Sequence, residues 1–89
     1  MALIHLTIVS PQGKFYEADA QRVMVRTTGG DVAILPRHID YSAALAEQGQ
    51  ARVTEADGTV RRGEVQGGLL HVSKDDVQVI TNRFQWMDE

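Results

Sequence analysis

Three histidines, His5, His38 and His71, are the side chains of this sequence best suited to bind a metal or transfer a proton. None of them has a second histidine four residues away, and the chain has no cysteine that could supply a thiolate ligand. His5 and His71 alternate with apolar residues, so both are expected on the exposed side of a strand. The histidines therefore do not predict a metal site.

Acidic and glycine pairs offer two further kinds of chemistry. Asp75 and Asp76 are adjacent, but they fall on an expected turn, where both carboxylates stay solvated and ionised rather than acting as general acids. Gly29–Gly30 and Gly67–Gly68 match no phosphate-binding glycine motif at the start of a helix. We therefore expect a non-catalytic protein without a cofactor or nucleotide site.

The basic residues are scattered, apart from a cluster of Arg52, Arg61 and Arg62 around an expected hairpin. This cluster would suit phosphate or an acidic partner, or it could be a solvated strand edge that discourages aggregation. The formal net charge is −3, which argues against a general nucleic-acid surface. No nucleic-acid partner is predicted.

The elements that would position these residues are short strands. Leu3 to Val9 alternates apolar and polar residues, and glycine-containing turns join two expected hairpins. The hairpins are Ala20 to Thr28 with Asp31 to Leu35, and Gln50 to Glu55 with Thr59 to Gln66. Leu69 to Ser73 and Val77 to Thr81 complete the pattern.

Turn signals recur along the whole chain, and no helix-length periodic segment occurs. Ser42 to Ala46 is ambiguous between helix and strand, and the tail from Asn82 to Glu89 is too short for an independent helix. The expected fold is a single all-β domain over residues 1–89, an antiparallel β-sandwich or flattened barrel of about eight to ten short strands.

Two segments resemble a known family. Gly30 to His38 is similar to the Gly-x-x-Gly-Ile-Leu-Pro-x-His loop of ATP synthase epsilon subunits, and Gly67 to Val72 is similar to a glycine-paired strand in the same family. Leu6 to Pro11 and Val23 to Val25 follow in family order. The resemblance covers roughly residues 3 to 83 and again implies a β-sandwich, as the N-terminal domain of such a subunit.

The resemblance implies a part of the rotating central stalk that joins the gamma subunit to the membrane c-ring and couples ion translocation to ATP synthesis. It places the protein peripherally on the cytoplasmic face of a bacterial inner membrane. The c-ring contact would fall on the motif residues Asp31, Arg37, His38 and Asp40. The gamma subunit would meet exposed apolar residues, for which alternation and the tail suggest Met24, Phe84, Trp86 and Met87.

The sequence departs from the family pattern at Ala33, at Ile39-Asp40-Tyr41 and at Arg61-Arg62. The second departure leaves the coupling ion, proton or sodium, open. Nothing after Trp86 could form the C-terminal helical hairpin typical of the family, so inhibition and ATP binding by that hairpin are not expected here. The alternative function is a small β-sandwich module that binds a peptide, sugar or oligonucleotide.

Overall fold

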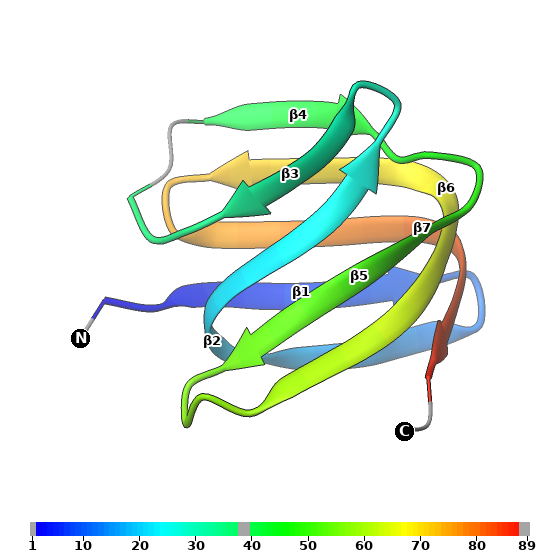
Figure 1. The fold of residues 1–89 in the computed structure, drawn as a ribbon. Coiled ribbons are helices and arrows are strands. Elements are labelled where there is room, and N and C mark those ends of the chain that lie inside the picture. Colours follow the sequence, from blue (N-terminus) through cyan, green and yellow to red (C-terminus); the bar gives the residue numbers. More distant parts are fainter. Residues whose placement is uncertain (1, 38–39, 88–89) are drawn as a thin grey trace.

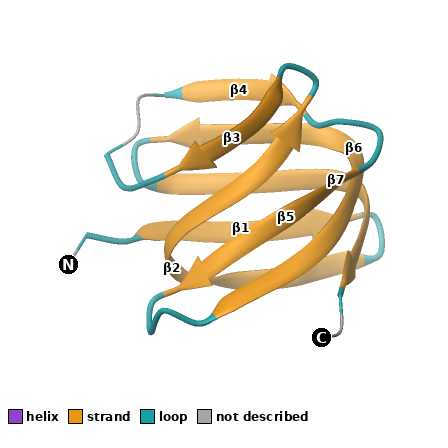
Figure 2. Ribbon diagram, in the orientation of Figure 1, coloured by secondary structure: helices purple, strands orange, loops and turns teal. Residues whose placement is uncertain are grey.

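The computed structural model describes residues 2–37 and 40–87, and the part it describes contains seven strands and no helix (Figures 1 and 2). The strands are β1 (Ile4–Ser10), β2 (Gly13–Thr27), β3 (Gly30–Ile34), β4 (Tyr41–Ala44), β5 (Gly49–Glu55), β6 (Val60–Ser73) and β7 (Asp76–Trp86). Within the described residues, no helical segment of the length and hydropathy needed to span a membrane is found. The all-β expectation is confirmed.

Five of the strands close into a ring in the order β1-β7-β6-β5-β2, because β2 pairs back with β1. β3 extends the ring beside β2, and β4 extends it beside β6. The ring is flattened into two layers, with β3, β5 and the second half of β2 in front of β1, β4 and most of β7 in Figure 1, while the first half of β2 lies beside β1. A ring of five strands cannot alternate in direction all the way round, and β1 and β7 are the pair that runs parallel. The expected antiparallel sandwich therefore includes one parallel pair.

The core lies between the layers and is made by the alternation read from the sequence. Ile4, Leu6 and Ile8 of β1 are fully buried, and Val23 and Val25 of β2 meet them from the other layer. The remaining core is aliphatic and aromatic, with Ile34, Val53, Leu70, Val72, Val77, Val79 and Phe84 among its members. Burial of these apolar surfaces is the main force that stabilises so small a domain.

The strands are fewer and longer than expected because two expected strands are joined in β6. Thr59 to Gln66 and Leu69 to Ser73 were read as separate, yet β6 runs from Val60 to Ser73 through Gly67–Gly68. Before that point the odd-numbered residues 63 and 65 are buried, and after it the even-numbered residues 70 and 72 are buried. We call this switch a change of phase, and β7 changes phase beside it. The glycines, with φ of 64° and 110°, permit the bend.

Thr81 of β7 holds this bend together. Its hydroxyl group lies 3.2 Å from the carbonyl oxygen of Gln66, 2.8 Å from that of Gly67 and 3.1 Å from that of Arg83, so it can donate to any of these three acceptors. The side chain is itself buried. A buried hydroxyl thus partners backbone groups that the change of phase leaves without regular ladder bonds.

Two ambiguous segments are settled by tertiary pairing. Ser42 to Ala46 contains a strand rather than a helix, since Tyr41 to Ala44 pairs with β6. The expected tail is mostly the end of β7, which continues to Trp86 and pairs with the first half of β6. Gly63 lies directly beneath the ring of Phe84, and a side chain at position 63 would occupy that space. The missing side chain of Gly63 therefore makes room for the tail to join the core.

We predict that Gly68→Ala destabilises the domain by at least about 2 kcal/mol, because φ is unfavourable and the new Cβ would lie 2.6 Å from the Cα of Thr81. Gly29→Ala is the matched control, since its Cβ would approach no atom closer than 3.8 Å. Urea unfolding followed by tryptophan fluorescence measures both changes. Equal stability of the two variants would contradict the role given to the bend.

Candidate interaction surfaces

Among the described residues, no group of three or more histidine and carboxylate side chains is arranged to hold a metal ion. His5 and His71 lie on exposed faces of their strands, as alternation predicted, whereas His38 lies outside the described residues. Interaction surfaces are therefore the sites to consider.

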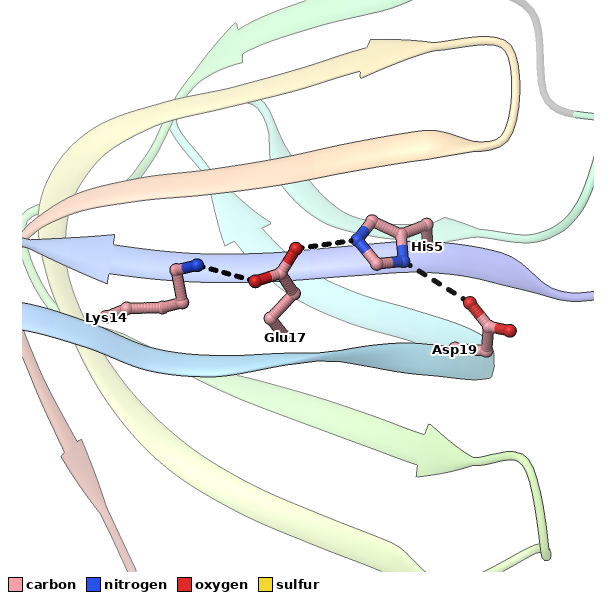
Figure 3. A network of polar contacts seen from close by, with 4 residues as sticks. All are labelled: His5, Lys14, Glu17 and Asp19. Atoms are coloured by element: carbon pink, nitrogen blue, oxygen red, sulfur yellow. Dashed lines mark hydrogen bonds and ion pairs between the residues drawn. The ribbon is translucent and has the colours of Figure 1, made fainter.

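His5 is exposed but not isolated. Its Nε2 lies 3.1 Å from Glu17 and its Nδ1 lies 3.3 Å from Asp19, both on the paired strand β2. Figure 3 shows the ring between the two carboxylates, with Lys14 on the far side of Glu17 at 2.5 Å. The bond to Glu17, followed by the bond to Asp19, raises the pKa of His5 above its usual 6.5. Lys14, followed by His5, lowers the pKa of Glu17.

The residues expected to contact the c-ring are divided between the two ends of β3. Asp31 follows the β2–β3 hairpin, where Arg26 Nε lies 3.0 Å from its carboxylate. Arg37 and Asp40 belong to the connection that follows β3, beyond the opposite end of this strand at Ile34. His38 falls in the same connection, outside the described residues. One end of the sandwich therefore does not carry all four residues.

Arg37 and Asp40 are tied to the β6–β7 turn. The backbone N–H of Arg37 donates to the carboxylate of Asp75 at 2.8 Å, and the N–H of Lys74 donates to the carboxylate of Asp40 at 3.0 Å. Arg37 and Lys74 both have positive φ, so each bond holds a backbone conformation that is otherwise unfavourable. Asp40 and Asp75 thus have a structural role in joining two turns.

The residues expected to contact gamma also separate. Met24 is half-buried on the outer face of β2, and Met87 remains 37% exposed. The expectation of exposure is wrong for Phe84, which is only 4% exposed because its ring fills the space above Gly63. Trp86 packs against the core, so the two aromatic side chains of the tail are covered within the domain.

An aromatic cluster explains why Trp86 is covered. Its ring meets Phe84 edge-on at 4.8 Å and Tyr16 at 5.8 Å, and the Arg61 guanidinium lies 3.8 Å from its centroid. Burial, together with a hydrogen bond to Glu55, raises the pKa of Tyr16 to about 12. Arg61 is therefore part of this cluster, and the expected basic cluster retains only Arg52 and Arg62 on one face.

An exposed row of apolar residues, which the sequence analysis did not predict, crosses the back layer, which contains β1, β4 and β7. Ala44, Leu69, Ile80 and Val9 are successive cross-strand partners on β4, β6, β7 and β1. Leu69 and Ile80 are 42% and 41% exposed, respectively. We call these four residues the apolar stripe. Only the pairing of strands far apart in sequence brings them together, although the doublets Leu69–Leu70 and Val79–Ile80 show that one apolar residue of each must face outward.

The neighbouring row on the same face is polar. Ser42 pairs with His71 across the strands, with the hydroxyl oxygen 3.0 Å from the imidazole Nδ1, and Gln78 and Thr7 continue the row. The apolar stripe is therefore bounded by hydrogen-bonding groups. An apolar centre with a polar edge is the composition of a protein–protein interface.

Comparison with known proteins gives one consistent family. Residues 3–87 match the family described as "ATP synthase, Delta/Epsilon chain, beta-sandwich domain". The chain is 32% identical over 85 residues to the ATP synthase epsilon chain of Caldanaerobacter subterraneus, covering 96% of this chain and 61% of that relative. It is 34% identical over 89 residues to the epsilon chain of Mycolicibacterium vanbaalenii, covering 74% of that relative.

A similar fold occurs in solved structures. A chain in the Euglena gracilis mitochondrial ATP synthase, from a structure of its OSCP, F1 and c-ring, superposes with a TM-score of 0.89 at 22% identity. The match covers 97% of this chain and 54% of that chain. A chain from the central stalk and c-ring of the Tetrahymena thermophila enzyme gives a TM-score of 0.76 at 12% identity. At these identities the likeness establishes the fold.

We predict that NMR titration gives His5 a pKa above 6.5 and that Glu17→Gln lowers it, because the strongest hydrogen bond to the imidazolium is lost. The raised pKa means that the stabilisation by His5 is complete below pH 6.5 and is lost as pH rises through the folded-state pKa. Glu64→Gln, on the other layer, is the control and should leave the His5 pKa unchanged. A His5 pKa that is insensitive to Glu17→Gln would contradict the network.

Proposed function

Because this chain belongs to the family of ATP synthase delta/epsilon β-sandwich domains, we propose that it acts in the central stalk, joining the gamma subunit to the c-ring. In this role it is a non-catalytic rotor component that helps couple ion translocation to ATP synthesis. Two solved ATP synthase assemblies that include a c-ring contain a chain of this fold. The similarity to bacterial epsilon chains supports a position on the cytoplasmic side of a bacterial membrane, held there through the complex.

The apolar stripe is the observation that carries the proposal. A small domain gains stability by burying aliphatic side chains, yet Leu69 and Ile80 lie side by side with about two fifths of their surface exposed. Leu69 is paired with β4 on one side and β7 on the other, and Ile80 with β6 and β1, so neither residue lies on a free strand edge. We assign it as the gamma contact, in place of the buried Phe84 and the covered Trp86.

Met24 and Met87 remain candidates for a smaller gamma contact outside the stripe. Met24 lies on the other layer, and Met87 follows the last strand, so neither is continuous with Leu69 and Ile80. A rigid partner that covers the stripe would reach Met24 only by wrapping around the sandwich. The stripe is therefore the main surface in this proposal.

For the c-ring contact we propose the β2–β3 hairpin with Asp31. Thr28, Gly29 and Gly30 are exposed at the tip, and Asp31 presents a carboxylate beside it. Arg37, Asp40 and His38 belong to the connection at the other end of β3, where Asp40 already holds the turn at Lys74. These three residues form a separate candidate contact, and substituting them is expected to reduce ring assembly less than substituting Asp31 does.

We predict that Leu69→Asp combined with Ile80→Asp weakens capture of the gamma subunit by at least about tenfold, because two carboxylates would be buried in an apolar interface. Val60→Asp is the matched control, since Val60 is also 41% exposed but lies outside the stripe. Co-expression with gamma followed by affinity purification measures the effect. The assignment fails if the double variant, folded by circular dichroism, retains gamma as well as the control does.

We predict that Asp31→Lys reduces assembly with purified c-ring more than Asp40→Lys does, when equal amounts of folded protein are compared. Asp31 is bonded only to neighbouring Arg26 on the surface, so its reversal should change the melting temperature little. Asp40→Lys should lower the melting temperature because a backbone N–H loses its acceptor. The reverse order of ring binding would move the contact to the connection that contains Arg37.

A further inference from the structure

The outer face of the front layer carries an excess of arginine. Arg22, Arg26, Arg52 and Arg62 are all exposed there, on β2, β5 and β6, and Asp31 and Glu64 are the carboxylates among them. The whole protein has a net charge of −3, so this positive surface runs against the overall charge. We call these four residues the arginine face.

Arg52 and Arg62 are directly opposite each other on β5 and β6. In the described part of the chain, neither guanidinium has a carboxylate within ion-pair distance, whereas Arg26 is paired with Asp31. Like charges at directly opposed positions destabilise a sheet. The isolated domain therefore holds two neighbouring cations in an arrangement that a bound carboxylate would stabilise.

A shallow hollow lies beside these arginines. It has a volume of about 280 Å³ and is lined by Met24, Arg26, Asp31, Gln48, Gly49, Gln50 and Arg52. Gly49 shapes it, because a Cβ at that position would lie 2.8 Å from the Cβ of Arg26. The hollow thus combines Arg52 with the Arg26–Asp31 ion pair and the side chain of Met24, and it contains residues from both expected contact sets.

We propose that the arginine face binds an acidic segment of a protein partner, with one carboxylate in the hollow near Arg26 and Arg52 and another at Arg52 and Arg62. Guanidinium groups bind carboxylates through two parallel hydrogen bonds, which selects for side chains of defined position. Met24 adds an apolar contact for the partner's chain between its acidic residues. This site is distinct from the apolar stripe, which lies on the opposite layer.

Two features favour a protein segment over an anionic membrane. The cations are all arginines on paired strands, and Arg26 and Arg52 line a hollow that an extended chain can enter more readily than a flat membrane surface. Clustered flexible lysines, typical of membrane-binding segments, are not present on this face.

The test uses a fluorescein-labelled twelve-residue peptide of glutamate, leucine and alanine, and a second peptide with glutamine in place of every glutamate. Fluorescence anisotropy should detect binding of the acidic peptide, weakening with added salt, and little binding of the glutamine peptide. Arg52→Gln with Arg62→Gln should weaken binding by about tenfold. Arg83→Gln, which removes an exposed arginine elsewhere, is the matched control and should bind as the original chain does.

A stability measurement separates a binding role from a structural one. Arg62→Glu should raise the melting temperature by about 2 °C or more, because it places opposite charges across β5 and β6, while it weakens peptide binding. The proposal is overturned if both peptides bind equally or if the double variant binds like the Arg83→Gln control. It is also overturned if the original chain binds neither peptide but binds phosphatidylglycerol vesicles or self-associates with rising concentration, and the double substitution abolishes that vesicle binding or self-association.

Discussion

The pairing of β1 with β2 closes the five-stranded ring, and the two-layer shape of that ring depends on β6 and β7, which change phase together at Gly67–Gly68. One half of each of these two strands lies in the front layer and the other half lies in the back layer. At the bend, the side chains that face the core switch between odd-numbered and even-numbered residues. Gly67 and Gly68 supply the backbone conformation, and Thr81 supplies a hydroxyl donor beside three backbone carbonyls. Without this bend the two layers could not enclose one core.

The same bend determines which residues are left on the outside. Once the phase changes, Leu69 and Ile80 face away from the core, and their partners on β4 and β1 complete the apolar stripe. In the front layer, the outward positions of β5 and β6 are occupied by Arg52 and Arg62. One rigid framework therefore presents an apolar surface on one side and a basic surface on the other, as a component that touches more than one partner requires.

The aromatic cluster at the end of β7 has a complementary role. Phe84 occupies the space left by Gly63, Trp86 packs on Phe84 and Tyr16, and Arg61 covers the Trp86 ring. These contacts fix the final strand against β6 and bury apolar surface that a free tail would expose. The last strand is consequently part of the framework.

The sequence by itself determined the all-β class, the hairpins at Gly29–Gly30 and Asp57–Gly58, and the inward side of β1 and β2. These features are local, because turn residues and the two-residue period of a strand are written in consecutive positions. Tertiary structure alone decided that β1 pairs in parallel with β7, that Phe84 is buried and that Leu69 meets Ile80. Each of these depends on strands that are distant in the chain, and the alternation within one strand does not specify which strand it pairs with or in which register.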